Sequence, residues 1–142
     1  MTVTEQVLEF KKKYPWTIAW RLKKNASVIE KHLNPGEKVL YAFAGQRKLS
    51  RYDIFHTAVV AITNKRIIVG RKRVIFGYFF DAVTPDMFNH FKMKVGFFFG
   101  RVIIDTIKEK MMISCVSKKA MPEIETALSE NIMLLKRDYE GE

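Results

Sequence analysis

The chain has 142 residues, which is the length of one domain and leaves little room for a second. Hydrophobic residues make up 48% and charged residues 28% of the sequence, so a packed core is expected and wholesale disorder is excluded. Lysine and arginine outnumber aspartate and glutamate by 25 to 15, and the resulting net charge of +10 predicts an anionic partner such as lipid head groups, nucleic acid or an acidic protein. A single cysteine, Cys115, excludes an intramolecular disulfide and a multi-cysteine metal site.

No segment of the sequence has the composition of a membrane span or a signal peptide. The longest stretch without Asp, Glu, Lys or Arg is Ile54–Asn64, with 11 residues, whereas a spanning helix needs about 20 apolar residues. Glu5, Glu9 and three lysines at 11–13 interrupt the region where a signal peptide would carry its apolar run. We therefore expect a cytoplasmic protein. Peripheral attachment at the inner face of the membrane is compatible with this expectation.

The first segment of the chain is predicted to be helical. Thr2 and Glu5 fit a capping box at the start of an amphipathic helix. Pro15 interrupts this helix, because proline has no backbone N–H to donate. Apolar residues then recur every three or four positions over residues 18–33, which predicts a second helix that ends at the Asn-Pro-Gly sequence of residues 34–36.

The middle of the chain changes to a pattern typical of strands. Residues 38–117 hold 14 of the basic and 5 of the acidic residues, and they are rich in Val, Ile, Phe and Tyr. The predicted turns are short, so we expect neighbouring strands to be antiparallel. Gly100 is assigned to one turn, and Asp81–His90 to an irregular crossing between two sheets. The seven predicted strands are Lys38–Gln46, Phe55–Thr63, Arg66–Arg71, Val74–Phe80, Phe91–Phe99, Arg101–Ile107 and Met111–Ser117.

The last segment is predicted to be an amphipathic helix that starts near Pro122, a residue suited to the first helical turn. The element order gives a mainly β (β+α) fold class. We predict three parts of the chain: an N-terminal helical extension over residues 1–36, a single domain over residues 37–137, and a frayed acidic tail over residues 138–142.

Two motifs in the sequence resemble one protein family. Residues 34–40, Asn-Pro-Gly-Glu-Lys-Val-Leu, resemble the opening of the bacterial, YokE-like pleckstrin-homology (PH) domains. Residues 61–68, Ala-Ile-Thr-Asn-Lys-Arg-Ile-Ile, resemble a hairpin of the same family. The resemblance covers about Leu33 to Leu135. It implies a PH-like seven-stranded antiparallel barrel capped by a C-terminal helix, with no catalytic residues.

The resemblance also implies where the positive charge gathers. In a PH-like barrel the loops after strands 1, 3 and 6 lie at one end, opposite to the C-terminal helix. This predicts a basic rim that associates with an anionic surface, the inner membrane leaflet being preferred. The second strand lacks the Arg-x-Arg pattern of eukaryotic relatives, which favours diffuse attraction to lipid, at about 1 kcal/mol per cation, over an inositol-phosphate pocket. The predicted rim residues are Arg47, Lys48, Arg51, Arg71, Lys72, Arg73, Lys108 and Lys110.

Two aromatic segments are further candidates. Trp16 and Trp20 lie where aromatic and basic residues alternate, as in helices of the membrane interface, and they are predicted to anchor a membrane or a partner. The alternative is that both indoles pack on the barrel. Phe97–Phe99 is expected in a strand beneath a helix, with an oligomer contact as the alternative. A protein-interaction or homo-oligomerisation scaffold without a lipid role therefore stays open.

Enzymatic chemistry finds little support in the residues. His32, His56 and His90 have no metal-ligand spacing, and no nucleophile motif or phosphate-binding glycine loop occurs. Cys115 alternates with inward-facing residues and is expected to be a small buried apolar side chain. No catalytic residue, metal or cofactor is therefore predicted. Nucleic acid is disfavoured as a partner, because the sequence lacks the RNP1 order and the βαββαβ pattern.

Overall fold

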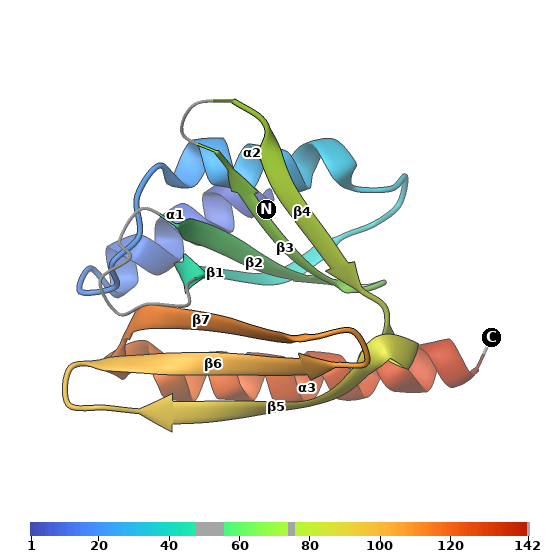
Figure 1. Ribbon diagram of the computed structural model, residues 1–142. Helices are drawn as coiled ribbons and strands as arrows, with labels where there is room; N and C mark the ends of the chain where they lie inside the picture. Colours follow the sequence, from blue (N-terminus) through green and yellow to red (C-terminus); the bar gives the residue numbers. More distant parts are fainter. Residues whose placement is uncertain (48–55, 74–75, 142) are drawn as a thin grey trace.

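Two helices, a curled antiparallel sheet and a long C-terminal helix follow one another along the chain. This is a computed structural model, and it describes residues 1–47, 56–73 and 76–141 (Figure 1). The helices are α1 (Val3–Lys13), α2 (Leu22–His32) and α3 (Met121–Glu140), with short 3-10 turns η1 (Pro85–Met87) and η2 (Lys118–Ala120). The strands are β1 (Val39–Arg47), β2 (Thr57–Thr63), β3 (Ile67–Lys72), β4 (Tyr78–Val83), β5 (Phe88–Val95), β6 (Phe99–Thr106) and β7 (Lys110–Ser117).

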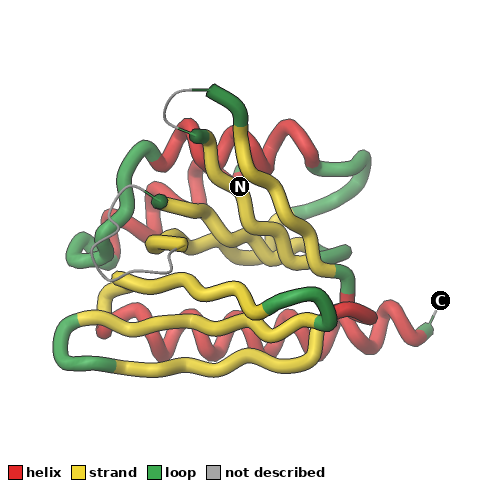
Figure 2. Tube along the Cα trace, in the orientation of Figure 1, coloured by secondary structure: helices red, strands yellow, loops and turns green. Residues whose placement is uncertain are grey.

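All seven strands belong to one sheet with the order β4-β3-β2-β1-β7-β6-β5, and each pairing is antiparallel. Figure 2 shows the sheet curling into two halves, β1–β4 above and β5–β7 below. The halves join where β1 pairs with β7 through Gln46 and Arg47. At this junction a Cβ on Gly45 would lie 2.7 Å from the backbone oxygen of Ser114, so only glycine permits the close approach. The predicted seven-stranded antiparallel sheet is confirmed.

The helix α3 closes the core between the two halves of the sheet. Its apolar stripe is buried in the same cluster as the inward-facing side chains of β1–β3 and β5–β7, and each such side chain contributes about 1.5–3 kcal/mol. The predicted C-terminal helix is therefore confirmed, and it continues through Glu140, three residues beyond its predicted end at Arg137. The buried stripe consists of Ile124, Leu128, Ile132 and Leu135.

The helices α1 and α2 cover the outer face of the β1–β4 half (Figure 1). The predicted capping box is present, because the backbone N–H of Glu5 donates to Thr2 Oγ1 at 3.1 Å. The Phe10 ring of α1 reaches the main core and lies 6.2 Å from the ring centroid of Phe43. Both N-terminal helices thus pack on the outer face of the sheet, and α1 also reaches the main core through Phe10.

The chain between α1 and α2 runs along β7 and is not helical. The N–H of Ile18 donates to the carbonyl oxygen of Cys115 at 2.9 Å, and the N–H of Ser117 donates to Thr17 Oγ1 at 2.9 Å. Cys115 forms a β-bulge with a φ of +59°, which leaves its side chain half-buried. The expectations of a helix from Ile18 and of a buried Cys115 were therefore wrong. The β1–β7 pairing stops at Gln46, so this segment supplies partners to the end of β7.

The strand predictions differ from the structure most between β4 and β6. The turn assigned to Gly100 lies at Phe97-Phe98, where the N–H of Gly96 donates to the oxygen of Phe99 at 2.8 Å. Gly100 instead lies within β6, packed against the Met121 side chain. An aromatic run therefore occupies a hairpin turn that composition alone assigns to a strand.

The predicted irregular crossing Asp81–His90 is also shorter than expected. Asp81–Val83 completes β4 and Phe88–His90 begins β5, so the crossing reduces to Thr84 and η1. Three residues of predicted strands, Phe55, Val74 and Ile75, lie outside the described residues.

Candidate functional site

The two family-like motifs meet in a buried ion pair. Glu37 of the first motif accepts from Arg66 of the second, with Nε to Oε2 at 3.0 Å and Nη2 to Oε1 at 3.1 Å. The Glu37 side chain is fully buried, and it also accepts from Thr63 Oγ1 at 2.6 Å. Burial alone raises the pKa of Glu37, but the hydrogen bonds, led by that from Arg66, outweigh it and lower the pKa. The motifs thus hold the start of β1 against the β2–β3 turn and have a structural role.

Arg47, the first predicted rim residue, is engaged within the protein. Its Nη2 lies 3.1 Å from Glu109 Oε1 in the β6–β7 turn, and its guanidinium carbon lies 4.1 Å from the ring centroid of Phe79 on β4. With only 20% of its side chain exposed, Arg47 links both halves of the sheet across the open side of the barrel. It contributes little positive charge to the surface.

The other rim residues lie in two groups. Lys72 and Arg73 are exposed at the end of the β3–β4 hairpin, next to the half-buried Arg71. Lys108 and Lys110 are exposed on either side of Glu109 in the β6–β7 turn. Figure 1 shows the hairpin end at the top and the turn at the right of the lower half. Arg47 contacts both groups, through Phe79, the cross-strand partner of Arg71, and through Glu109. The remaining two predicted rim residues, Lys48 and Arg51, lie outside the described residues.

A second cationic surface, the outer face of β5–β7, was not predicted. Lys92 and Lys94 alternate with Phe91 and Met93, which pack against the core, so both lysines point outward. Lys94 lies directly opposite Arg101 of β6. The cations of this outer face are Lys92, Lys94, Arg101 and Lys110.

The acidic content of the outer face is low. Among the described residues of β5–β7, Asp105 is the acidic side chain on this face, and its Oδ2 lies 3.4 Å from His90 Nδ1. Like charges placed directly opposite in a sheet are destabilising, so the Lys94–Arg101 pair does not serve stability. The alternation of Lys92 and Lys94 in the sequence already indicates that both lie on one face of a strand. Their pairing with Arg101 cannot be predicted in the same way, because it depends on where the β5–β6 turn lies.

Both predicted anchors are exposed, Trp16 to 67% and Trp20 to 51%, so neither indole is buried against the barrel. The backbone N–H of Trp20 donates to Thr57 Oγ1 of β2 at 2.9 Å, which places Trp20 beside the β1–β4 half of the sheet. Trp16 stacks on Phe98 of the β5–β6 turn, with ring centroids 6.4 Å apart, and Phe97 beside it is 83% exposed. The helix expected to cover Phe97–Phe99 is therefore not found over Phe97 and Phe98.

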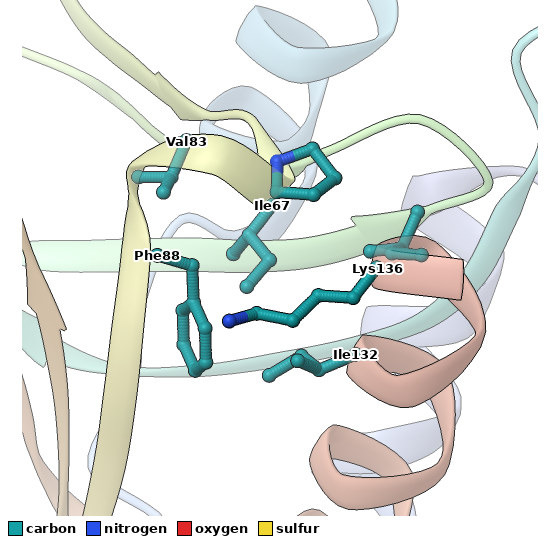
Figure 3. Close-up of a pocket in the computed structure, with 7 residues that line it drawn as sticks. Ile67, Val83, Phe88, Ile132 and Lys136 are labelled. Carbon is teal, nitrogen blue, oxygen red and sulfur yellow. The ribbon is translucent and has the colours of Figure 1, made fainter. Parts of the chain in front are cut away.

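An apolar depression lies between α3 and the part of the sheet where β3 begins and β4 ends (Figure 3). Its cavity volume is about 10 Å³, which is far below the roughly 300–1,000 Å³ of a typical ligand pocket. The Lys136 side chain extends across it, and its Nζ lies 5.5 Å from the ring centroid of Phe88. This site is better described as a shallow surface filled by a lysine stem than as a ligand pocket.

The described residues contain no group of three His, Cys, Asp or Glu side chains that converges as a metal site. Within the same ranges, no helix has the length and apolar character required to span a bilayer.

The match to a family model agrees with the observed architecture. A family model described as Bacterial PH domain matches residues 33–130. Among solved structures, a DUF1696 family protein with a pleckstrin-homology domain from Shewanella loihica PV-4 is similar over 78% of this chain and 89% of that chain, with 14% sequence identity and a TM-score of 0.49. No curated protein matches. The family model covers more than half of the chain, including all seven strands. The chain therefore belongs to the bacterial PH domain family.

Proposed function

We propose that this protein is a non-catalytic binding module that attaches to an anionic lipid surface, with the inner membrane leaflet as the preferred surface. One observation carries the proposal: Lys92, Lys94 and Arg101 are exposed on a single face of the sheet, with two of them directly opposite one another. Lys108 and Lys110 extend the same positive region around the β6–β7 turn. An anionic surface relieves the repulsion that this arrangement otherwise imposes.

The expected strength of this attraction is modest. Each basic side chain near an anionic bilayer contributes about 1 kcal/mol, so these residues together contribute about 5 kcal/mol. That corresponds to a dissociation constant in the range of roughly 0.1–1 mM, which gives reversible and salt-sensitive binding. Lys72 and Arg73 at the end of the β3–β4 hairpin, which belong to the predicted basic rim, are the rival docking site.

Charge reversal in pairs distinguishes the two faces. We expect Lys92→Glu with Lys94→Glu to abolish co-sedimentation with vesicles of equimolar phosphatidylglycerol and phosphatidylcholine at low salt. Lys72→Glu with Arg73→Glu is the matched variant on the rival site. Lys23→Glu with Lys24→Glu on exposed positions of α2 is the matched control. All three variants change the net charge by the same amount, so only the position of the reversed charge differs.

Other results would reject the proposal in distinct ways. Equal loss of binding in all three variants would mean that net charge alone acts, through a general field with no docking face. Loss only in the Lys72 and Arg73 variant would move the docking site to the β3–β4 hairpin end. Binding that ignores phosphatidylglycerol, or no binding at all, would favour the alternative scaffold that contacts proteins or further copies of this chain.

A further inference from the structure

The β5–β6 turn and the segment after α1 form an exposed aromatic projection at one end of the cationic sheet half. We call Trp16, Val95, Phe97 and Phe98 the aromatic tip. Figure 1 shows the turn at the left edge of the lower half, with the chain that leads from α1 to α2 above it. Phe97 is 83% and Phe98 56% exposed, and their rings meet edge to face with centroids 4.6 Å apart.

The residue types of this turn are unusual for a two-residue hairpin. Two-residue hairpin turns favour Asn, Asp and Gly, because the preferred turn types need positive φ at the central positions. Phe97 and Phe98 occupy these positions, and neither has a positive φ. Exposing large aromatic rings at a turn also contributes nothing to folding, since the rings stay in water. The unusual feature is the exposure of both rings, and clustered exposed apolar side chains are typical of interaction sites.

The aromatic tip is held in a fixed position. Trp16 is followed by Thr17 and Ile18, which are hydrogen-bonded to the end of β7. The N–H of Lys118 donates to the oxygen of Phe98 at 3.2 Å and so ties the turn to the start of η2. The rings therefore project from a rigid base and do not need to be ordered when they meet a partner.

Four cations lie next to the β5–β6 turn that carries the aromatic tip. Lys94 and Arg101 form the strand pair next to the last pair of the hairpin, Val95 and Gly100. Lys118 and Lys119 are exposed at the start of η2, beside Phe98. Exposed aromatic side chains next to several cations are complementary to the boundary of an anionic bilayer, where the aromatic side chains enter the acyl region and the cations stay among the head groups.

We infer that the aromatic tip inserts into an anionic membrane and anchors the protein that the cationic face attracts. This inference rests on the proposed function and adds the group that makes the attachment resistant to salt. A protein partner fits the tip less well, because a stable protein interface needs about 20–30 residues a side and the tip offers four. Insertion of both phenylalanines is expected to strengthen binding by roughly tenfold or more.

Fluorescence of a single tryptophan tests the inference directly. In a Trp20→Phe background, Trp16 reports on the aromatic tip, and we expect brominated acyl chains in phosphatidylglycerol-containing vesicles to quench its emission. Phe97→Ser with Phe98→Ser is expected to abolish the quenching and the binding that persists at about 0.5 M salt, while low-salt binding remains. Both positions are exposed, so the fold should persist, which circular dichroism and thermal melting check.

The outcomes separate this inference from the proposed function. Binding of the Trp20→Phe protein to anionic vesicles without quenching overturns insertion and leaves charge-driven docking intact. Equal salt resistance in the parent and the double serine variant also overturns insertion. No binding to anionic or to pure phosphatidylcholine vesicles overturns both. An oligomer that the serine substitutions convert to a monomer, with vesicle binding unchanged, would reassign the tip to contacts between copies of this chain.

Discussion

At the scale of single residues, Glu37 and Arg66 show how a sequence motif becomes a structural contact. The carboxylate is fully buried and accepts two hydrogen bonds from the guanidinium, whose second nitrogen also donates to the oxygen of His32 at 2.8 Å. Breaking one partner of a buried pair leaves the other charge unpaired, which costs more than the pair itself contributes. Glu37 and Arg66, one from each family-like motif, thus stabilise the fold and are engaged with each other.

Glu37→Gln is expected to lower the free energy of unfolding by about 3 kcal/mol at neutral pH, because it leaves Arg66 without its counter-charge. The pKa of Glu37 is lowered below its ordinary value of 4.5. Its contribution to stability is therefore complete above pH 4.5 and is lost as the pH falls through the lowered pKa. Urea unfolding from neutral to acidic pH measures this, and Glu37→Gln should show a shallower loss of stability below pH 4.5 than the parent protein.

Arg47 shows the opposite relation between residue type and role. Its position just after the predicted strand Lys38–Gln46 predicts a free cation on a basic rim, but the guanidinium lies between Glu109 and the ring of Phe79. An arginine side chain can stack on an aromatic ring and pair with a carboxylate at once, so its presence in a loop does not by itself make it a binding residue.

At the scale of elements, the position of each turn decides which residues share a face. Placing the hairpin turn at Phe97-Phe98 brings Gly100 into β6 and pairs Lys94 with Arg101. With the turn at Gly100 these residues would have taken other cross-strand partners. A shift by even one residue exchanges the two faces of a strand, so the cationic face depends on this one turn.

Gly100 is also where α3 packs on the sheet, and an added Cβ would collide with the side chain of Met121. Gly100→Ala is expected to destabilise the protein by about 1–3 kcal/mol through overpacking. Met121→Ala alone leaves a cavity and is also destabilising. The double variant Gly100→Ala with Met121→Ala should lose less unfolding free energy than the two single losses added together, by about 1 kcal/mol or more. A double-mutant cycle from urea unfolding measures this coupling.

Gly45 is the matched control for this cycle. Its added Cβ would meet the backbone oxygen of Ser114 at 2.7 Å, which no side-chain substitution can remove. Gly45→Ala should therefore be destabilising with no rescue by Met121→Ala. An additive result for Gly100 and Met121 would contradict the packing described for α3 on β6.

At the scale of the whole molecule, the N-terminal helices and the barrel form one hydrophobic structure. Val3, Val7 and Ile29 are buried against the outer face of β1–β3, and Phe10 lies in the main core. Tyr41 of β1 donates to Glu123 of α3 at 2.8 Å, and Lys13 of α1 pairs with the same carboxylate. Three elements from different parts of the chain therefore meet at one side chain.

A chain that begins at residue 34 is expected not to fold as a stable monomer. Removing α1 and α2 would expose Val59, Ala61 and Ile68, which are fully buried in the full chain. An apolar sheet face of this kind promotes association. Cooperative thermal unfolding and size-exclusion chromatography measure the effect, with the full chain as control. A soluble monomer of residues 34–142 with the same unfolding midpoint would instead support an independent PH-like domain.

The sequence by itself determined the features that depend on neighbouring residues. The capping box of Thr2 and Glu5, the break after α1, the alternating strands of the first meander and the long C-terminal helix were all predicted and are present. Each arises from hydrogen bonding and side-chain periodicity within a few residues.

Only the tertiary structure decided the surfaces. The chain around Ile18 leaves helical geometry to pair with β7, the Phe97-Phe98 turn overrides the strand preference of its rings, and Arg47 turns inward to Glu109. Lys92, Lys94 and Arg101 come together on one face of strands whose boundaries composition alone misplaces. These outcomes depend on register and on contacts between distant segments, which side-chain types along the chain do not encode locally.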